Sequence, residues 1–408
     1  MRMVQLMLVI LCTVVYCQAS PLKLLSFNTR LTADELYTRS RFLKTVQTLK
    51  RLDADVLCLQ EVWNDEHLFS LIEDLEWKFP FSYSFVHNVG GLLNEKLDLP
   101  NSKCSEKDGD RLLKCIKNNC LNSKDSEEFH SCYVNECNPF DLNLNEACRE
   151  CTTLQIEACI KIMPQNVNKD RIMECLKQIK RPRGICSSRT IDTKANHGLL
   201  MLSNVPLNSQ RRGIFTKDSL IARGFLEAKN NFGEKFVCTQ MTTGRSSVYS
   251  ETKTHFNNWY DLKESEVEQL VNMYSQSKQT YILGNFNVGP AMPSNGIKPY
   301  YSDLYKIMED RGLENIIVRE AGKCTLCANN ELAKDDISNS YIVDGCILVN
   351  VDRCRLSNEV IFKENMLLNP RTRKHYPLSD HYATLSTFCD NLELFLTSSD
   401  DGSGSGGN

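Results

Sequence analysis

The sequence predicts a layered α/β fold that carries a disulfide-rich, mainly helical insertion. Short apolar runs typical of buried strands alternate along most of the chain with stretches in which apolar residues recur at helical spacing. One segment, between Cys104 and Cys186, has no strand-like run and holds ten cysteines. Together these observations indicate substantial sheets with flanking helices, interrupted by a small unit with its own cross-links.

The N-terminal residues 1–19 are typical of a secretory signal peptide. Arg2 precedes an apolar run at 4–16 that is short for a membrane span, and residues 17–19 form a small-residue cleavage site. A membrane anchor is the alternative interpretation. We expect a secreted, extracellular protein with no transmembrane segment once the signal peptide is removed.

Most of the remaining chain, residues 20–103 and 187–392, is assigned to one α/β domain, followed by a low-complexity, disordered tail at 393–408. Strands are expected at 22–30, 55–63, 197–207, 223–230, 234–243, 280–286, 340–351 and 381–388. Helices are expected at 40–52, 66–79 and 259–276. This alternation is the basis for the predicted fold class.

The insertion, residues 104–186, is predicted to be a self-contained unit of about five disulfides, because its cysteines are even in number and the chain carries a signal peptide. They are Cys104, Cys115, Cys120, Cys132, Cys137, Cys148, Cys151, Cys159, Cys175 and Cys186. A zinc site through Cys148 and Cys151 is the alternative interpretation.

An odd number of cysteines remains in the exported chain. Of the 19 cysteines, two lie in the signal peptide, which leaves 17 and therefore at least one thiol without a partner in the chain. Cys58, Cys238 and Cys346 lie inside apolar, strand-like runs. We interpret these three as buried free thiols.

Charge and composition exclude little. The net charge of −3 gives no overall basic field that would attract nucleic acid, and 41% hydrophobic with 24% charged residues is ordinary for a globular protein. Basic stretches at 180–184 and 210–213 are interpreted as solvated loops. Composition therefore leaves the natural ligand open.

Polar residues that can carry chemistry directly follow or end several predicted strands. They are Asn28 in SFN, Glu61 in LQEVW, Asn285 and Asn287 in GNFN, Asp344 in IVDG, and Asp380 and His381 in LSDH. A single polar residue in such a place is more often a strand-end cap than a ligand. Several of them predict a site at one edge of the sheets.

In order and spacing, these motifs resemble the endonuclease/exonuclease/phosphatase superfamily, which includes deoxyribonuclease I and the neutral sphingomyelinases. LQEVWNDEHLFSLIEDL is most similar to the sphingomyelinase branch, and HGLLMLSNVPL resembles a strand pair of that family. The resemblance covers about residues 21–100 and 187–390. It implies a four-layered α/β/β/α sandwich with the site at one end of two packed sheets.

The resemblance also implies phosphodiester cleavage assisted by a divalent ion, usually Mg²⁺. Glu61 matches the family's metal ligand, assisted by Asn28, and hard oxygen ligands of this kind suit Mg²⁺. We expect this chain to bind Mg²⁺ weakly or not at all, with any weak binding at Glu61, because Asn28, Glu61, Asp380 and His381 match the family.

Four further residues match catalytic positions of the family. Asp380 and His381 match an acid–imidazole pair in which the acid orients the ring and the ring handles a proton or stabilises negative charge. Asn287 matches a residue that donates to the phosphoryl group. Asp344 matches the acid that supports another catalytic histidine.

Two catalytic positions depart from the family pattern. Asn285 stands where the family has an aspartate, and Gln240 stands where it has a second histidine. Neither amide exchanges a proton near neutral pH, and the loss of two acid–base groups predicts a rate lower by on the order of 10⁴-fold or more. His255 is the alternative counterpart of the second histidine, if the loop is placed in another register.

We therefore expect a secreted, catalytically impaired protein with a phosphodiesterase fold. It would bind a phosphodiester or phospholipid ligand, or an extracellular protein partner. One alternative is an active, metal-dependent extracellular phosphodiesterase that is sphingomyelinase-like or nuclease-like. The other is a structural extracellular matrix-type protein, in which the insertion carries the function.

Overall fold

The computed structural model describes residues 21–31, 38–86, 88–89, 104–139, 141–161, 169–177, 186, 197–216, 223–243, 256, 258–318, 323–333, 337–368 and 375–389. The predicted signal peptide, the C-terminal tail, the basic stretch 180–184 and His255 lie outside these residues. Within them, no helix has both the length and the apolar content needed to cross a membrane.

The larger sheet has seven strands in the order β11-β14-β1-β2-β5-β3-β4. Its strands are β1 (Leu22–Leu31), β2 (Val56–Val62), β3 (Phe81–Ser84), β4 (Asn88–Val89), β5 (Leu200–Ser203), β11 (Arg355–Ile361) and β14 (Ala383–Phe388). β1 and β2 are parallel, with Asn28 opposite Gln60, whereas β14 runs antiparallel to β1. The parallel pair therefore delivers the polar ends of β1 and β2 to the same edge of the sheet.

The smaller sheet has five strands in the order β10-β9-β8-β7-β6. Its strands are β6 (Asn208–Thr216), β7 (Arg223–Lys229), β8 (Lys235–Gln240), β9 (Thr280–Asn285) and β10 (Asp344–Val349). The register places Gln240 opposite Asn285, and Asn285 opposite Asp344. Three predicted site residues from distant parts of the chain thus form one row across the end of this sheet.

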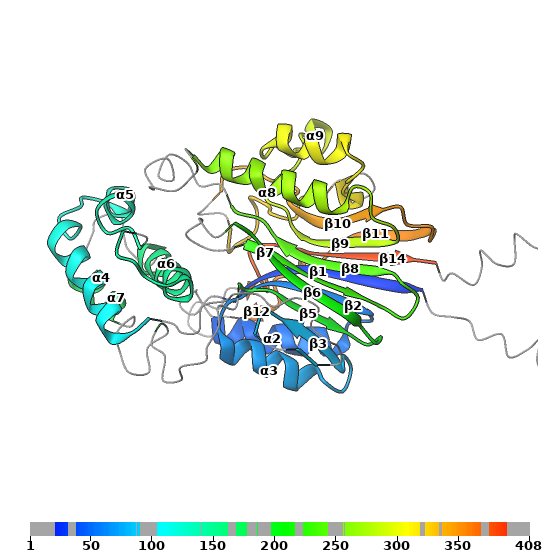
Figure 1. The fold of residues 1–408 in the computed structure, drawn as a ribbon, viewed down its shortest axis with the longest axis horizontal. Helices are drawn as coiled ribbons and strands as arrows, with labels where there is room; N and C mark the ends of the chain where they lie inside the picture. The colour runs from blue at the N-terminus through cyan, green and yellow to red at the C-terminus, as the bar shows by residue number, and fades with distance from the viewer. Residues whose placement is uncertain are drawn as a thin grey trace, which may run out of the picture.

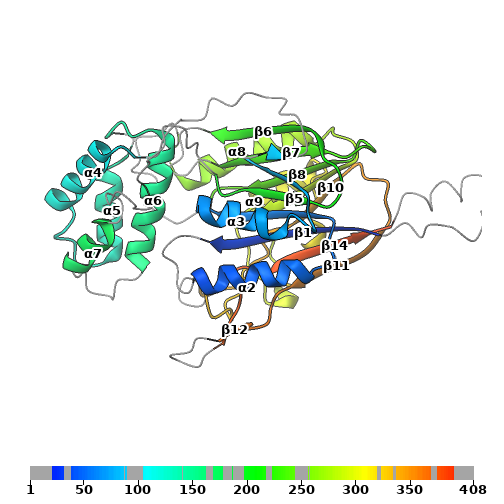
Figure 2. The ribbon, with the colours of Figure 1, turned by 90° about the horizontal axis from the view of Figure 1, so that it is seen from below.

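The two sheets pack against each other, and helices cover their outer faces (Figures 1 and 2). Alternate side chains of one strand divide between the layers: Leu24 and Cys58 join the core between the sheets, whereas Leu25 and Leu57 face the helices. Helices α2 (Thr38–Arg51) and α3 (Asp65–Leu75) cover the larger sheet, and α8 (Trp259–Tyr274) and α9 (Ser302–Asp310) cover the smaller one. Two mixed sheets with flanking helices confirm the predicted α/β class.

Several elements were not predicted, namely β3, β4, β6, β11, α9 and the short strands β12 (Leu367–Leu368) and β13 (His375–Tyr376). β6 contains the basic stretch 210–213, so its interpretation as a solvated loop is wrong. Arg212 is buried and its guanidinium donates to the carbonyls of Ser84 and Phe85, while Arg211 pairs with Glu227 at 3.0 Å. Arg212 is thus satisfied by buried carbonyl groups, and Arg211 by a buried carboxylate while part of its side chain stays exposed.

In its described residues, the insertion forms four helices around a core of its own, which includes Leu112, Phe129 and Ile156. They are α4 (Glu106–Asn119), α5 (Ser126–Glu136), α6 (Glu146–Lys161) and α7 (Lys169–Leu176). In both views they lie together to one side of the sheets (Figures 1 and 2). The domain boundaries remain a prediction, but the mainly helical character of this segment is confirmed.

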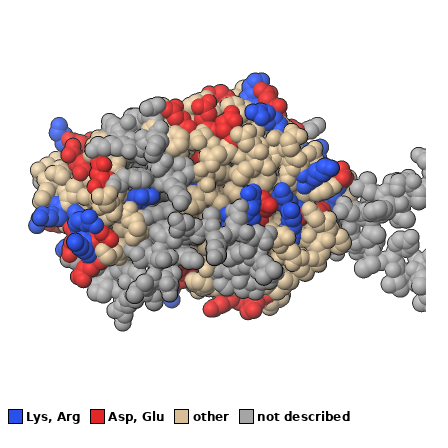
Figure 3. All heavy atoms as spheres, in the orientation of Figure 1, with Lys and Arg blue, Asp and Glu red and all other residues tan. Residues whose placement is uncertain are grey.

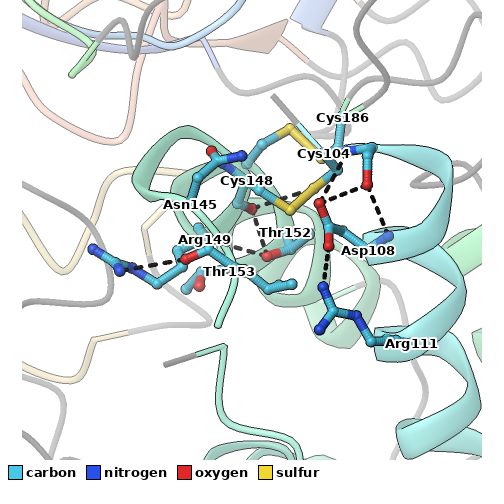
Figure 4. Close-up of a disulfide and its surroundings, with 12 residues drawn as sticks. Cys104, Asp108, Arg111, Asn145, Cys148, Arg149, Thr152, Thr153 and Cys186 are labelled. Carbon is cyan, nitrogen blue, oxygen red and sulfur yellow. Dashed lines mark hydrogen bonds and ion pairs between the residues drawn. A yellow bond between two sulfur atoms is a disulfide. The ribbon is translucent and has the colours of Figure 1, made fainter. Parts of the chain in front are cut away.

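All ten cysteines of the insertion pair among themselves. The bridges are Cys104–Cys148, Cys115–Cys137, Cys120–Cys132, Cys151–Cys186 and Cys159–Cys175. Because Cys148 and Cys151 are both oxidised, the zinc interpretation is wrong. The amide of Cys104 donates to the carbonyl of Cys186 at 3.0 Å, so the two ends of the unit meet beside two disulfides (Figure 4).

Outside the insertion, two of the three expected free thiols are in fact bonded. Cys58 in β2 and Cys238 in β8 form a disulfide between the two sheets. Cys346 is free and buried, as predicted. The other bridges are Cys324–Cys327 and Cys354–Cys389. Two buried cysteines facing each other across packed sheets cannot be distinguished from free thiols by their own strand patterns.

Candidate functional site

The predicted site residues meet at one end of the two sheets. Asn28 Nδ2 donates to Glu61 Oε1 at 3.1 Å within the larger sheet. Gln240 Nε2, from the smaller sheet, donates to the same oxygen at 2.8 Å. One carboxylate oxygen therefore accepts two amide hydrogen bonds and joins the sheets at this end.

The backbone is strained at three residues of this end. Arg30, Glu61 and Asn287 have φ angles of 46°, 60° and 51°, in the left-handed region that residues with a side chain rarely adopt. Strain of this kind persists only where the surrounding structure enforces it, and it is concentrated at functional sites. The surrounding structure therefore holds these three residues in an unfavourable backbone conformation, as is common at functional sites.

The environment of Glu61 does not fit the magnesium ion that the family resemblance implies. Asn28 Oδ1 accepts the amide of Arg30 at 3.1 Å, which turns the N–H₂ group of Asn28, and not its oxygen, toward Glu61. Mg²⁺ requires oxygen ligands at about 2.0–2.1 Å. Among the described residues, no group of three or more His, Cys, Asp or Glu is arranged to hold a metal ion.

His381 is oriented by Asp344. Its Nδ1 lies 2.7 Å from Asp344 Oδ2, whereas Asp380 Oδ2 is 4.0 Å from Nε2. In this structure the ring of His381 is therefore oriented by Asp344 and not by Asp380, and the catalytic roles of the two acids stay predictions. Burial lowers the pKa of His381, but the charges of Asp344 and Asp380 outweigh it and raise this pKa to about 9.

Asp380 has a different partner, Arg30, which the sequence analysis missed. Arg30 Nη1 and Asp380 Oδ2 are 2.6 Å apart, and their side chains are only 7% and 13% exposed. Arg41 on α2 is also buried and donates to the carbonyls of Leu378 and Thr29 at 3.0 and 3.3 Å. Arg41 therefore ties the end of β1 to the loop that leads to Asp380. The sequence did carry a signal for Arg30, because it is a charged residue within an otherwise apolar strand pattern.

The two asparagines after β9 hold the shape of their loop. Asn285 Oδ1 accepts the amide of Asn287 at 3.0 Å, and Asn287 Nδ2 donates to the carbonyl of Met241 at 2.8 Å. In this structure the Asn287 side chain is thus committed to protein. Its role as a donor to a phosphoryl group stays a prediction.

Helix α8 supports the same loops from behind with two buried charges. Lys263 Nζ donates to the carbonyl of Asn287, and burial lowers its pKa to about 7. Glu266 accepts from the amide and the hydroxyl of Thr242 at 2.7 and 2.6 Å. Neither residue was identified from the sequence, because the helical pattern of this segment does not distinguish a buried charge from a solvated one.

One more cation lies near Gln240. Arg223 precedes Gly224, which is opposite Gln240 in the sheet, and its guanidinium lies 5.2 Å from the centre of the Trp63 ring. Its Nε and Nη1 are buried and have no hydrogen-bond partner among the described residues.

No family model matches the chain, and no curated protein matches it. Among solved structures, it is similar to sphingomyelinase C from Streptomyces griseocarneus, with a TM-score of 0.49 and 13% identity over 90% of this chain and 99% of that one. It is also similar to a beta toxin variant from Staphylococcus aureus with bound magnesium ions, with a TM-score of 0.49 and 12% identity over 90% and 99% of the two chains.

A third similar structure is an endonuclease/exonuclease/phosphatase from Beutenbergia cavernae, with a TM-score of 0.47 and 11% identity over 91% of this chain and 72% of that one. The sequence motifs resemble the same superfamily, and the same sphingomyelinase branch, that appear in the names of these structures.

Proposed function

We propose that this chain is a secreted protein of the endonuclease/exonuclease/phosphatase type, built as a four-layered α/β/β/α sandwich, that has lost hydrolysis and binds an anionic phosphodiester or phospholipid ligand. The observation that carries the proposal is the Gln240 amide, which donates to Glu61 at 2.8 Å in the place of a titrating histidine. An amide in this position holds the site together but transfers no proton.

The remaining histidine does not replace the lost base. With a pKa raised to about 9, His381 is protonated near neutral pH and has no lone pair with which to accept a proton from water. Asn285 also lacks a titrating group. Three positions that would handle protons in a hydrolase are thus unable to act as a base near neutral pH.

Binding of an anion is supported by the cations at the same end of the sheets. Protonated His381 and Arg30 are paired with Asp344 and Asp380, and Arg223 carries buried donors that have no partner among the described residues. Guanidinium groups match the geometry of phosphate oxygens. On the face shown in Figure 3, basic and acidic side chains of the described residues are interspersed, without a continuous basic surface.

Secretion is supported by the apolar leader and by the number of disulfides. The described residues contain eight disulfides and one free cysteine, a degree of oxidation typical of proteins made in an oxidising compartment.

A hydrolysis assay tests the proposal, with sphingomyelin, DNA and a chromogenic phosphodiester as substrates and Mg²⁺ or Mn²⁺ present. The wild type is expected to show little turnover above the solvent background. The double reversion Gln240→His with Asn285→Asp is expected to restore measurable cleavage, and each single reversion less, because these groups act as a unit. Robust cleavage by the wild type that His381→Ala abolishes would instead establish the active-enzyme alternative.

A further inference from the structure

We propose that the amides of Asn28 and Gln240 close Glu61 to divalent metal ions, so that the site binds its ligand without a metal. The inference deepens the proposed binding function and rests on it for the ligand. The donors around the carboxylate of Glu61 control metal binding, and metal binding can be measured without knowing the ligand.

The two donors occupy the same oxygen. Glu61 Oε1 accepts from Asn28 Nδ2 at 3.1 Å and from Gln240 Nε2 at 2.8 Å. A cation bound to this oxygen would face two N–H groups whose hydrogens carry partial positive charge. Mg²⁺ also needs its ligands at about 2.0–2.1 Å in near-octahedral geometry, which leaves no place for these hydrogens beside Oε1.

The amide orientations resist rearrangement. Turning the amide of Asn28 to offer its oxygen would remove the acceptor of the Arg30 amide, which is 3.1 Å from Oδ1, and would leave a buried donor unsatisfied. Gln240 Oε1 is buried and has no hydrogen-bond partner among the described residues. Turned toward Glu61, it would set an oxygen against a carboxylate, so the charge of Glu61 fixes the observed orientation.

The other carboxylates at this end are also neutralised by the protein. Asp380 pairs with Arg30 at 2.6 Å, and Asp344 lies 2.7 Å from His381 Nδ1. Each of the three acids therefore has a donor or a cation from the chain itself. The positive charge that a metal would supply to such a cluster is already present in the protein.

Binding of Mn²⁺, measured by electron paramagnetic resonance on the full-length secreted chain, tests the inference. The wild type is expected to bind Mn²⁺ no more tightly than a control protein of similar charge. Gln240→Glu replaces a donor with a second carboxylate and is expected to bind Mn²⁺ about tenfold or more tighter, and Glu61→Gln in that background should remove the gain. The matched control is Gln279→Glu, because Gln279 donates to the carboxylate of Asp352 at an exposed position.

Gln240→Met keeps the volume and removes the donor, so it reports on the amide even if the glutamate variant does not fold. It is expected to increase Mn²⁺ affinity by a smaller factor, and circular dichroism confirms its fold. Tight Mn²⁺ binding by the wild type that Glu61→Gln abolishes would overturn the inference. So would folded Gln240→Glu and Gln240→Met variants that bind no better than the wild type. Substrate cleavage by a wild type with no Mn²⁺ site would overturn only the proposed loss of hydrolysis.

Discussion

Nδ1 of His381 lies 2.7 Å from Oδ2 of Asp344 and joins the loop before β14 to the first residue of β10. The two residues are buried and come from different sheets. The contact is therefore a link between the layers as well as part of the candidate site, and its charge state affects both stability and chemistry.

The stability contributed by His381 should depend on pH. Its folded-state pKa is raised from 6.5 to about 9, so its contribution is fully present below pH 6.5 and is lost as the pH rises toward 9. The shift corresponds to about 3 kcal/mol. As the pH rises from 6.5 to about 9, denaturant unfolding should show that the free energy of unfolding of the wild type falls relative to that of His381→Gln. Parallel curves for the two proteins would show that the ring is not protonated in the fold.

Lys263 should act in the opposite direction. Burial lowers its pKa from 10.5 to about 7, so the unfolded chain binds more protons between these values and the stability that depends on Lys263 rises with pH from 7 to 10.5. Relative to the wild type, Lys263→Met should therefore lose stability as the pH rises over this range. Lys306→Met, at an exposed position, provides the control for the loss of a lysine side chain. If the difference in free energy of unfolding between the wild type and Lys263→Met did not change with pH, the lowered pKa of Lys263 would be contradicted.

Removal of the disulfide between the sheets, Cys58–Cys238, should cost more stability than removal of a bridge that closes a short loop. Cys58 and Cys238 are separated by 180 residues, and in the chain-entropy model a loop of this length contributes about 5 kcal/mol. The double variant to alanine should lose about that much in free energy of unfolding. Removal of Cys120–Cys132, with a separation of 12 residues, should cost about 3 kcal/mol. Thiol labelling of the unfolded, non-reduced wild type should modify only Cys346, and labelling of Cys58 and Cys238 as well would show that this bridge does not form.

The ion pair of Arg30 and Asp380 should be worth far more than a surface pair. Both side chains are largely buried, so Asp380→Asn leaves a buried guanidinium without its counter-charge and should cost about 3 kcal/mol. Lys50 and Asp74 form a matched pair whose side chains are 36% and 44% exposed, and Asp74→Asn should cost less than about 1 kcal/mol. Equal losses in thermal or denaturant unfolding would mean that water reaches the Arg30 pair.

Much of the fold followed from local pattern. Apolar runs located strands such as β2 and β9 because burial on a sheet leaves a signature within the strand itself. The even number of cysteines between Cys104 and Cys186 also indicated a closed disulfide unit. This pattern was local as well, because all partners lie inside one segment. Elements with mixed patterns, such as the partly exposed edge strand β11, were missed.

The sequence by itself determined which residues reach the end of the sheets, because strand direction and length place Glu61, Gln240 and Asp344 there. Only the tertiary structure decided how they pair. Gln240 meets Glu61 across 179 residues, and Asp344 rather than the adjacent Asp380 meets His381. Partners of this kind depend on strand register and on how two sheets pack face to face, and neither leaves a trace in the pattern of a single strand.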